Sequence, residues 1–113
     1  MNRETVLSSV LIFCASCGRQ VPSTETQGRL CLDCRVSQAL EPLRLEHARL
    51  WRKRERYQRQ GARLDSLERQ VARVEERMAD RIRDLVSNDE RAAEYYNKEM
   101  EAARQARYDI RSR

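Results

Sequence analysis

From residue 36 to residue 92, an apolar residue recurs at every seventh position of the chain. A seven-residue apolar repeat forms one stripe along a helix and favours packing of that stripe against another helix in a left-handed coiled coil. The repeat therefore predicts a long coiled-coil helix over residues 36–86. The nine positions are Val36, Leu43, Leu50, Tyr57, Leu64, Val71, Met78, Leu85 and Ala92.

The second apolar row that a coiled coil needs is interrupted. Leu40 widens the stripe near its start, but the row is then occupied by His47, Arg54 and Gly61. Glycine inside a helix costs about 1 kcal/mol, so a bend or break at Gly61 is one alternative. Because the seven-residue phase continues across Gly61, we expect the helix to continue as well. The row fills again with Leu67, Val74 and Ile82.

The pattern restarts near residue 87. Ser87 and Glu90 have the spacing of a capping box, which begins a helix. The apolar stripe that follows matches the length of the refilled stripe over residues 64–85. We therefore expect residues 87–113 to fold back on the first helix as an antiparallel hairpin, the alternative being one continuous helix that pairs with another chain. The new stripe contains Ala92, Ala93, Tyr96, Met100, Ala103 and Ile110.

The composition agrees with a mainly α fold. Charged residues make up 36% of the 113 residues and aromatic residues only 5%, which is typical of long solvated helices. Three glycines and two prolines are too few for a loop-rich fold. The length is that of one domain, with three expected parts: an N-terminal segment and cysteine module over 1–35, a long coiled-coil helix over 36–86 and a shorter C-terminal helix over 87–113.

All the cysteines of the chain lie between residues 14 and 34, as two C-x2-C pairs separated by 13 residues. A zinc ion binds four thiolates at the corners of a tetrahedron, and one C-x2-C turn can supply two of those corners. Gly18 suits the turn after the first pair, because glycine tolerates left-handed conformations. Between the pairs we expect two very short strands, 19–21 and 29–30, with the chain reversal at 22–28.

This stretch resembles the small four-cysteine zinc ribbons and treble-clef fingers, in which a knuckle, a hairpin and a second knuckle share one zinc ion. The resemblance covers residues 13–35. It implies that the zinc ligands are Cys14, Cys17, Cys31 and Cys34. Since cysteine fills all four positions, no coordination site is left open for water or substrate, and the site is expected to be structural.

Three other roles are open to four cysteines. Two disulfides require an oxidising compartment, for which the chain has no export signal. A redox C-x2-C usually begins a helix in a larger βαβ fold, which the sequence does not predict. An iron–sulfur cluster also uses four thiolates, and the spacing alone does not exclude it.

The N-terminal apolar run over residues 6–13 is too short for a membrane span, which needs about 20 apolar residues. Ser8 and Ser9 interrupt the run, and Glu4 stands where a signal peptide carries positive charge. We therefore expect a cytoplasmic protein without membrane contact. The apolar run is expected to pack on the cysteine module or to dock on a partner.

Residues 36–63 carry a net charge of +5, equal to that of the whole chain. A ridge of cations on one helical face can follow a phosphate backbone, so we expect contact with RNA or DNA. Trp51 and His47 could then stack on a base or fill a partner's pocket. The alternative is a solvated face balanced by Glu46 and Glu55, with Trp51 filling the apolar seam. The ridge consists of Arg49, Arg52, Lys53, Arg56, Arg59 and Arg63.

A protein partner is the rival hypothesis. Under the hairpin interpretation, the apolar row over residues 40–64 has no partner within the chain, so we expect it to bind another chain or a second copy. The expected contact residues are Leu43, Leu50, Trp51, Tyr57 and Leu64.

An acidic cluster is expected at the tip of the C-terminal hairpin, formed by Asp80, Asp84, Asp89 and Glu90. A zinc module that carries a coiled-coil hairpin with an acidic tip is similar in outline to DksA/TraR-type proteins, which insert such a tip into RNA polymerase. The order of the parts is reversed in this chain. The same carboxylates can also serve simply as partners of the helix dipole.

No arrangement of catalytic residues is evident. His47 is the only histidine, and the chain has no glycine-rich phosphate loop, nucleophile elbow or histidine-based metal motif. We therefore expect a non-catalytic zinc-binding coiled-coil protein without a small-molecule substrate. Its expected role is that of an accessory or regulatory protein in bacterial or phage transcription or translation, which contacts nucleic acid through the basic ridge; the alternative is an adaptor that pairs its coiled coil with a partner chain.

Overall fold

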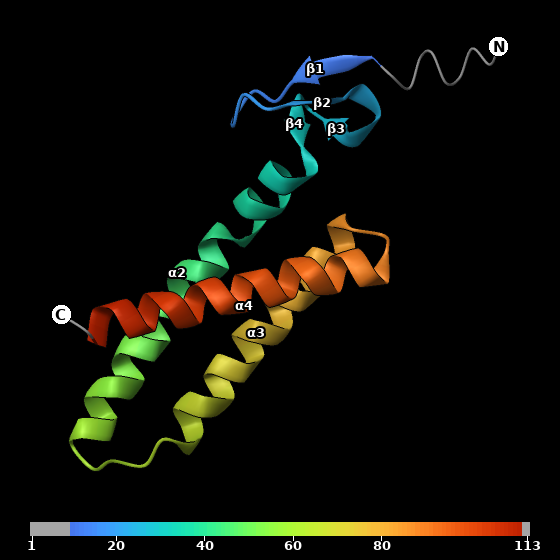
Figure 1. Cartoon of the computed structure of the whole chain (residues 1–113). Helices are drawn as coiled ribbons and strands as arrows, with labels where there is room; N and C mark the ends of the chain where they lie inside the picture. The colour runs from blue at the N-terminus through green and yellow to red at the C-terminus, as the bar shows by residue number, and fades with distance from the viewer. Residues whose placement is uncertain (1–9, 112–113) are drawn as a thin grey trace. The chain divides into compact units, whose positions relative to one another are not determined.

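The computed structural model describes residues 10–111 of this protein, with side chains up to Arg107. The fold is mainly helical, as predicted, with three long helices after a region of short strands (Figure 1). The chain forms two compact units, a cysteine unit, Met1–Ala39, and a helical unit, Leu40–Arg113. Helix α2, Leu32–Arg59, belongs to both. Pro42 lies inside α2 near the boundary, where it removes one helical hydrogen bond because proline has no backbone N–H.

Two antiparallel strand pairs form the cysteine unit. Strand β1, Leu11–Phe13, pairs with β2, Gln20–Pro22. Strand β3, Thr26–Gln27, pairs with β4, Leu30–Cys31. A short 3-10 helix, Ser23–Glu25, connects the two pairs. Helix α2 begins at the residue that follows β4, so the strand and the helix are joined without a loop.

The single hairpin predicted between residues 19–21 and 29–30 is wrong, because these strands pair with other partners. The turn between β3 and β4 is closed by Gly28 and Arg29, which both have positive φ angles, 58° and 65°. A two-residue turn of this kind joins the strands directly on either side of it. Residues 11–13 of the N-terminal apolar run form β1 and pair with β2. Leu11 and Phe13 are nevertheless 49% and 69% exposed, so the predicted packing of this run on the cysteine module stays a prediction; residues 6–9 lie outside the described part of the chain.

The single helix predicted over residues 36–86 is also wrong. Helix α2 ends at Arg59 and α3 extends over Asp65–Leu85, so residues 60–64 form a turn. Gly61 has a φ of 72°, its N–H donates to Gln58 O at 3.1 Å, and the Ala62 N–H donates to Tyr57 O at 3.0 Å. These two bonds around a left-handed glycine make a Schellman cap, which ends a helix. The seven-residue phase therefore crosses a turn between two helices that each carry an apolar stripe.

The substitution Gly61→Ala is expected to lower the free energy of unfolding of the helical unit by about 1 kcal/mol, because a left-handed backbone is costly once a Cβ is present. Nothing beyond the chain neighbours lies within 4 Å of that Cβ position, so the cost is one of backbone conformation. Urea denaturation followed by circular dichroism measures it. Gly61→Asn is the control and should lose less, because asparagine tolerates this conformation; equal losses would contradict the assignment.

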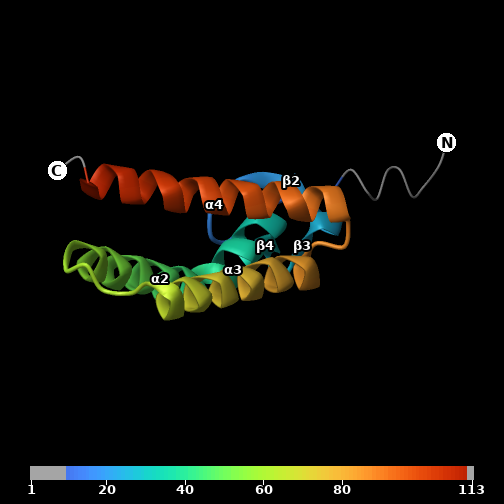
Figure 2. The same cartoon turned by 90° about the horizontal axis from the view of Figure 1, so that it is seen from below.

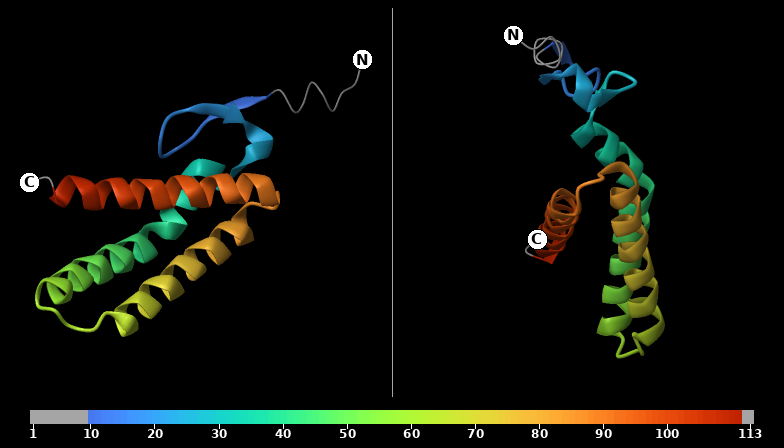
Figure 3. Two further views of the ribbon diagram at one scale, coloured as in Figure 1. Left: turned by 60° about the horizontal axis from the view of Figure 1, so that its bottom comes forward. Right: turned by 90° about the vertical axis from the view of Figure 1, so that its right-hand side faces the viewer.

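Helices α2 and α3 lie side by side and run in opposite directions, and α4, Asp89–Arg111, crosses them as a second layer (Figures 2 and 3). The chain turns back after α3, and α4 packs against α3, so the helices of the C-terminal half form the predicted hairpin packing. Asn88 caps α4, since its Oδ1 accepts the Arg91 N–H at 3.0 Å. This cap replaces the capping box predicted from Ser87.

The core of the helical unit is built from buried apolar side chains of all three helices. Leu43 and Leu50 are only 9% and 2% exposed, so the expectation that residues 40–64 lack a partner within the chain is wrong. The turn at residues 60–64 is the physical reason, because it brings α3 back along α2. The buried apolar residues of this unit are Leu40, Leu43, Leu50, Leu67, Val71, Val74, Met78, Ile82, Val86 and Ala92.

Candidate metal centre and basic ridge

The two cysteine pairs come from two different local structures. Cys14 and Cys17 lie on a tight turn after β1, in which the Gly18 N–H donates to Cys14 O at 2.9 Å. Gly18 has a φ of 73°, as its predicted role in this turn requires. Cys31 is the last residue of β4, and Cys34 lies in the first turn of α2. The second pair is therefore supplied by the junction of a strand and a helix.

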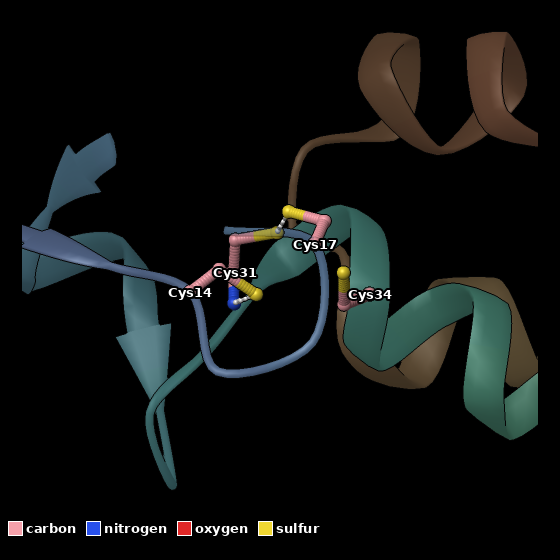
Figure 4. A group of neighbouring side chains, drawn as sticks. All are labelled: Cys14, Cys17, Cys31 and Cys34. Atoms are coloured by element: carbon pink, nitrogen blue, oxygen red, sulfur yellow. Dashed lines mark hydrogen bonds between the residues drawn. The ribbon is translucent and has the colours of Figure 1, made fainter. Parts of the chain in front are cut away.

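The four cysteine side chains point toward one another (Figure 4). Their Sγ atoms all lie within 4.8 Å of one another, and Cys17 Sγ is 3.9 Å from Cys31 Sγ. All four cysteines are free, and 3.9 Å far exceeds the S–S bond of about 2.05 Å in a disulfide. A tetrahedron with metal–sulfur bonds of about 2.3 Å separates its sulfurs by roughly 3.8 Å. The cluster therefore has the dimensions to hold a metal ion.

The cluster favours negative charge at one sulfur in particular. Backbone N–H groups of Cys17 and Cys31 donate to the Cys14 thiol and lower its pKa from 9.0 to about 5. The Cys31 N–H lies 3.4 Å from Cys14 Sγ. The pKa of Cys34 is raised to about 12, mainly by a hydrogen bond with Cys14 and next by burial. Four sulfurs this close repel one another when charged, and a divalent cation removes that repulsion.

Arg19 supplies positive charge beside the cluster. Its Nη2 donates to Cys31 Sγ at 3.8 Å and to Asp33 Oδ2 at 2.7 Å. The hydrogen bond to Asp33 is the main cause that raises the pKa of Arg19. Sequence reasoning placed Asp33 only near the helix start and gave Arg19 no role. Arg19 and Asp33 are 14 residues apart in the sequence, so their contact has no local signal.

The cysteines also form the small core of their unit. Cys14 and Cys31 are buried together with Val21, and Leu30 and Cys34 pack against them while remaining partly exposed. A cluster of this size contains few apolar side chains other than the cysteines themselves. The core of the cysteine unit is therefore small, and most of it is cysteine.

Outside the cysteine unit, most of the predicted basic ridge is exposed. Lys53 is half-buried and lies 5.7 Å from the Tyr57 ring, and Arg63 lies in the turn after α2 rather than on the helix. Arg59 contacts Glu55 at 3.8 Å. The remaining members make no side-chain hydrogen bond, ion pair or ring contact with any residue that the structure describes; these are Arg49, Arg52 and Arg56.

The prediction that His47 contacts a base or a partner is wrong, because His47 is only 3% exposed. Its Nε2 lies 3.1 Å from Glu75 Oε2 and 3.2 Å from Trp51 Nε1. Trp51 is half-buried, with the guanidinium of Arg107 3.9 Å and that of Arg54 5.0 Å from its ring centroid. Both aromatic rings therefore contribute to packing between the helices.

The other predicted partner residues are distributed between the core and the surface. Leu43 and Leu50 are buried, Leu64 is half-buried and Tyr57 is 36% exposed. Sequence reasoning missed the polar contacts that join the helices, above all Arg44 with Glu99 at 2.5 Å. These contacts had no local signal, because they require α3 and α4 to return along α2.

The predicted acidic cluster lies at the turn between α3 and α4. Its four members are exposed, and Asp80 contacts Arg83 within α3. Asp89 and Glu90 lie in the first turn of α4, where a carboxylate interacts favourably with the positive end of the helix. This position suits a role in stabilising the helix start.

None of the described helices has a stretch of apolar residues that would carry it across a membrane. Searches against protein-family models, curated proteins and solved structures returned no match for this chain.

Proposed function

We propose that this protein is a non-catalytic zinc-binding helical protein that contacts nucleic-acid phosphates through α2. The observation that carries the proposal is the contrast between two faces of the same helix. Leu43 and Leu50 are buried within the chain, whereas Arg49, Arg52 and Arg56 are exposed and make no contact with other described side chains. Unpaired arginines on one face are available to an external anion.

Zinc is the metal that the cysteine geometry supports best. Sulfurs within 4.8 Å of one another fit around one ion, whereas an iron–sulfur cluster places several irons between its ligands and needs wider spacing. Four thiolates at tetrahedral corners are a common structural zinc site. The helix start that supplies Cys34 supports the treble-clef rather than the ribbon type of finger. The free thiols support a reducing compartment such as the cytoplasm.

The spacing of the arginines suits a phosphate backbone. Arg49, Arg52 and Arg56 are separated by three and four residues, so they lie on one side of α2 and extend over about 10 Å. Arg59, which contacts Glu55 only at 3.8 Å, prolongs the row to the end of the helix. Such a row neutralises several successive phosphates without distinguishing bases. The proposed role is accordingly that of an accessory or regulatory protein of transcription or translation.

Replacing the three unpaired arginines, Arg49, Arg52 and Arg56, by glutamine is expected to weaken binding to mixed-sequence RNA or DNA by roughly tenfold or more. Each phosphate contact that is lost removes about 0.7–0.9 from the slope of log K against log salt, so the slope should fall by about 2–3. Fluorescence anisotropy over a salt series measures both quantities.

The matched control carries the same three substitutions on α3, at Arg69, Arg73 and Arg81, which are also exposed. Both variants have the same net charge, so only the position of the arginines differs. We expect the α3 variant to retain most of the affinity. Equal losses would place the binding elsewhere, and no binding by the wild-type protein at low salt would favour the protein-binding adaptor instead.

A further inference from the structure

The four cysteines of the proposed metal centre are exposed to very different degrees. Cys14 and Cys31 are 2% and 1% exposed, and Cys34 is half-buried. Cys17 is exposed. A small reagent in solution is therefore expected to reach Cys17 before the other three cysteines.

Hydrogen bonding separates the two buried sulfurs from the other two. Cys14 Sγ accepts the Cys31 N–H at 3.4 Å, and Cys31 Sγ accepts a hydrogen bond from Arg19 at 3.8 Å. A hydrogen bond to a thiolate stabilises its charge and makes it less nucleophilic. Among the described residues, no N–H group donates to the Sγ atom of Cys17 or of Cys34. Of these two cysteines only Cys17 is exposed, so exposure and hydrogen bonding together select Cys17.

A second sulfur lies close enough to react with Cys17 after it has been modified. Cys31 Sγ is 3.9 Å away, and it belongs to the other C-x2-C pair. A bond between these two sulfurs would link the knuckle turn after β1 to the end of β4. It would also remove one ligand from each pair.

We propose that Cys17 is a peroxide-reactive site of the metal centre and that Cys31 is its resolving cysteine. The proposal rests on the metal binding proposed above. It makes the cysteine unit an element that responds to oxidants, rather than only a scaffold.

The reaction proceeds in two steps that balance. The Cys17 thiolate attacks one oxygen of hydrogen peroxide, the O–O bond breaks, and hydroxide leaves to give the sulfenic acid at Cys17. The Cys31 thiolate then attacks the Cys17 sulfur, the S–O bond breaks, and a second hydroxide leaves as the disulfide forms. The two sulfurs lose two electrons in total, and the peroxide gains them. Cys14 and Cys34 alone do not hold a tetrahedral ion, so the metal is released.

Zinc-loaded full-length protein treated with less than one equivalent of hydrogen peroxide tests the chemistry. Trypsin cleaves after Arg19 and Arg29 and so separates the two cysteine pairs. A Cys17–Cys31 disulfide then joins two peptides in the mass spectrum, whereas a disulfide within either pair does not. We expect the joined species to form first, with Cys17 assigned by fragmentation, and zinc release measured with a colorimetric chelator to follow its formation.

Two variants that each keep four ligands make the test specific. Cys17→His removes the exposed sulfur and should slow peroxide-driven zinc release by roughly tenfold, since oxidation follows thiolate exposure. Cys34→His also replaces one ligand but keeps Cys17 and Cys31, so it should still form the Cys17–Cys31 disulfide and release zinc faster than Cys17→His. Equal slowing in both variants, or a first disulfide within one pair, would overturn the proposal. A wild-type protein that binds no zinc would instead contradict the metal assignment on which the proposal rests.

Discussion

Removal of the proposed zinc ion with a strong chelator is expected to unfold the cysteine unit over residues 10–39. The buried cluster of that unit consists of Cys14, Cys31 and Val21, with Leu30 and Cys34 partly buried against it. Its strands are only two or three residues long. Structural zinc contributes about 10–16 kcal/mol of binding free energy in zinc-finger peptides. No other interaction in a unit of this size can replace a contribution of that magnitude. Amide signals of these residues in an NMR spectrum should collapse to the unfolded range.

The helical unit is the internal control for this experiment. This unit has its own core, and it contains Trp51, the only tryptophan of the chain. Trp51 fluorescence and most of the helical circular dichroism should therefore persist in the chelator, and added zinc should restore the lost amide signals. A cysteine unit that keeps its dispersed signals without metal would show that the sulfurs bind nothing essential. Unfolding of the whole chain would show that the two units are not independent.

The cysteine cluster could be predicted from the sequence because its geometry is local. Two residues between cysteines fix the turn that presents both sulfurs, and Gly18 marks that turn by its conformational freedom. The strand pairing was not predictable in the same way. Strands of two or three residues carry almost no periodic pattern, so their partners are decided by turns such as the one at Gly28 and Arg29.

In the helical unit, the seven-residue apolar repeat obscured the capping residues that end α2. Most of the seven-residue row in α2 and α3 is buried, including Leu50 and Met78, but Tyr57 is 36% exposed. The row did not predict where the helix stops, because an apolar phase can continue across a turn. The stop was marked by Gly61 as a C-terminal cap, and α3 begins at Asp65, an acidic residue of the kind favoured at helix starts. The local cap at Gly61 therefore decides where α2 ends, although the seven-residue repeat continues beyond it.

The substitution Leu50→Ala is expected to destabilise the helical unit by about 2–5 kcal/mol, the usual cost of deleting a buried leucine side chain and leaving a cavity. Leu50 is 2% exposed and belongs to the row that was expected to need another chain. If α3 and α4 cover it, the whole loss appears in the isolated protein. Urea denaturation followed by circular dichroism measures the change in the free energy of unfolding.

Leu45→Ala is the matched control, because Leu45 lies on the same helix but is 64% exposed. The two substitutions remove the same atoms and change helix propensity equally, so burial is the only difference between them. The control should change stability by less than about 0.5 kcal/mol. Repeating both measurements at several protein concentrations separates the two origins of burial, since an interface between chains makes the unfolding midpoint rise with concentration. A large loss of unfolding free energy for Leu50→Ala that is independent of protein concentration shows that the apolar row is buried within one chain. A small loss, or an unfolding midpoint that depends on concentration, would show instead that another chain covers this row.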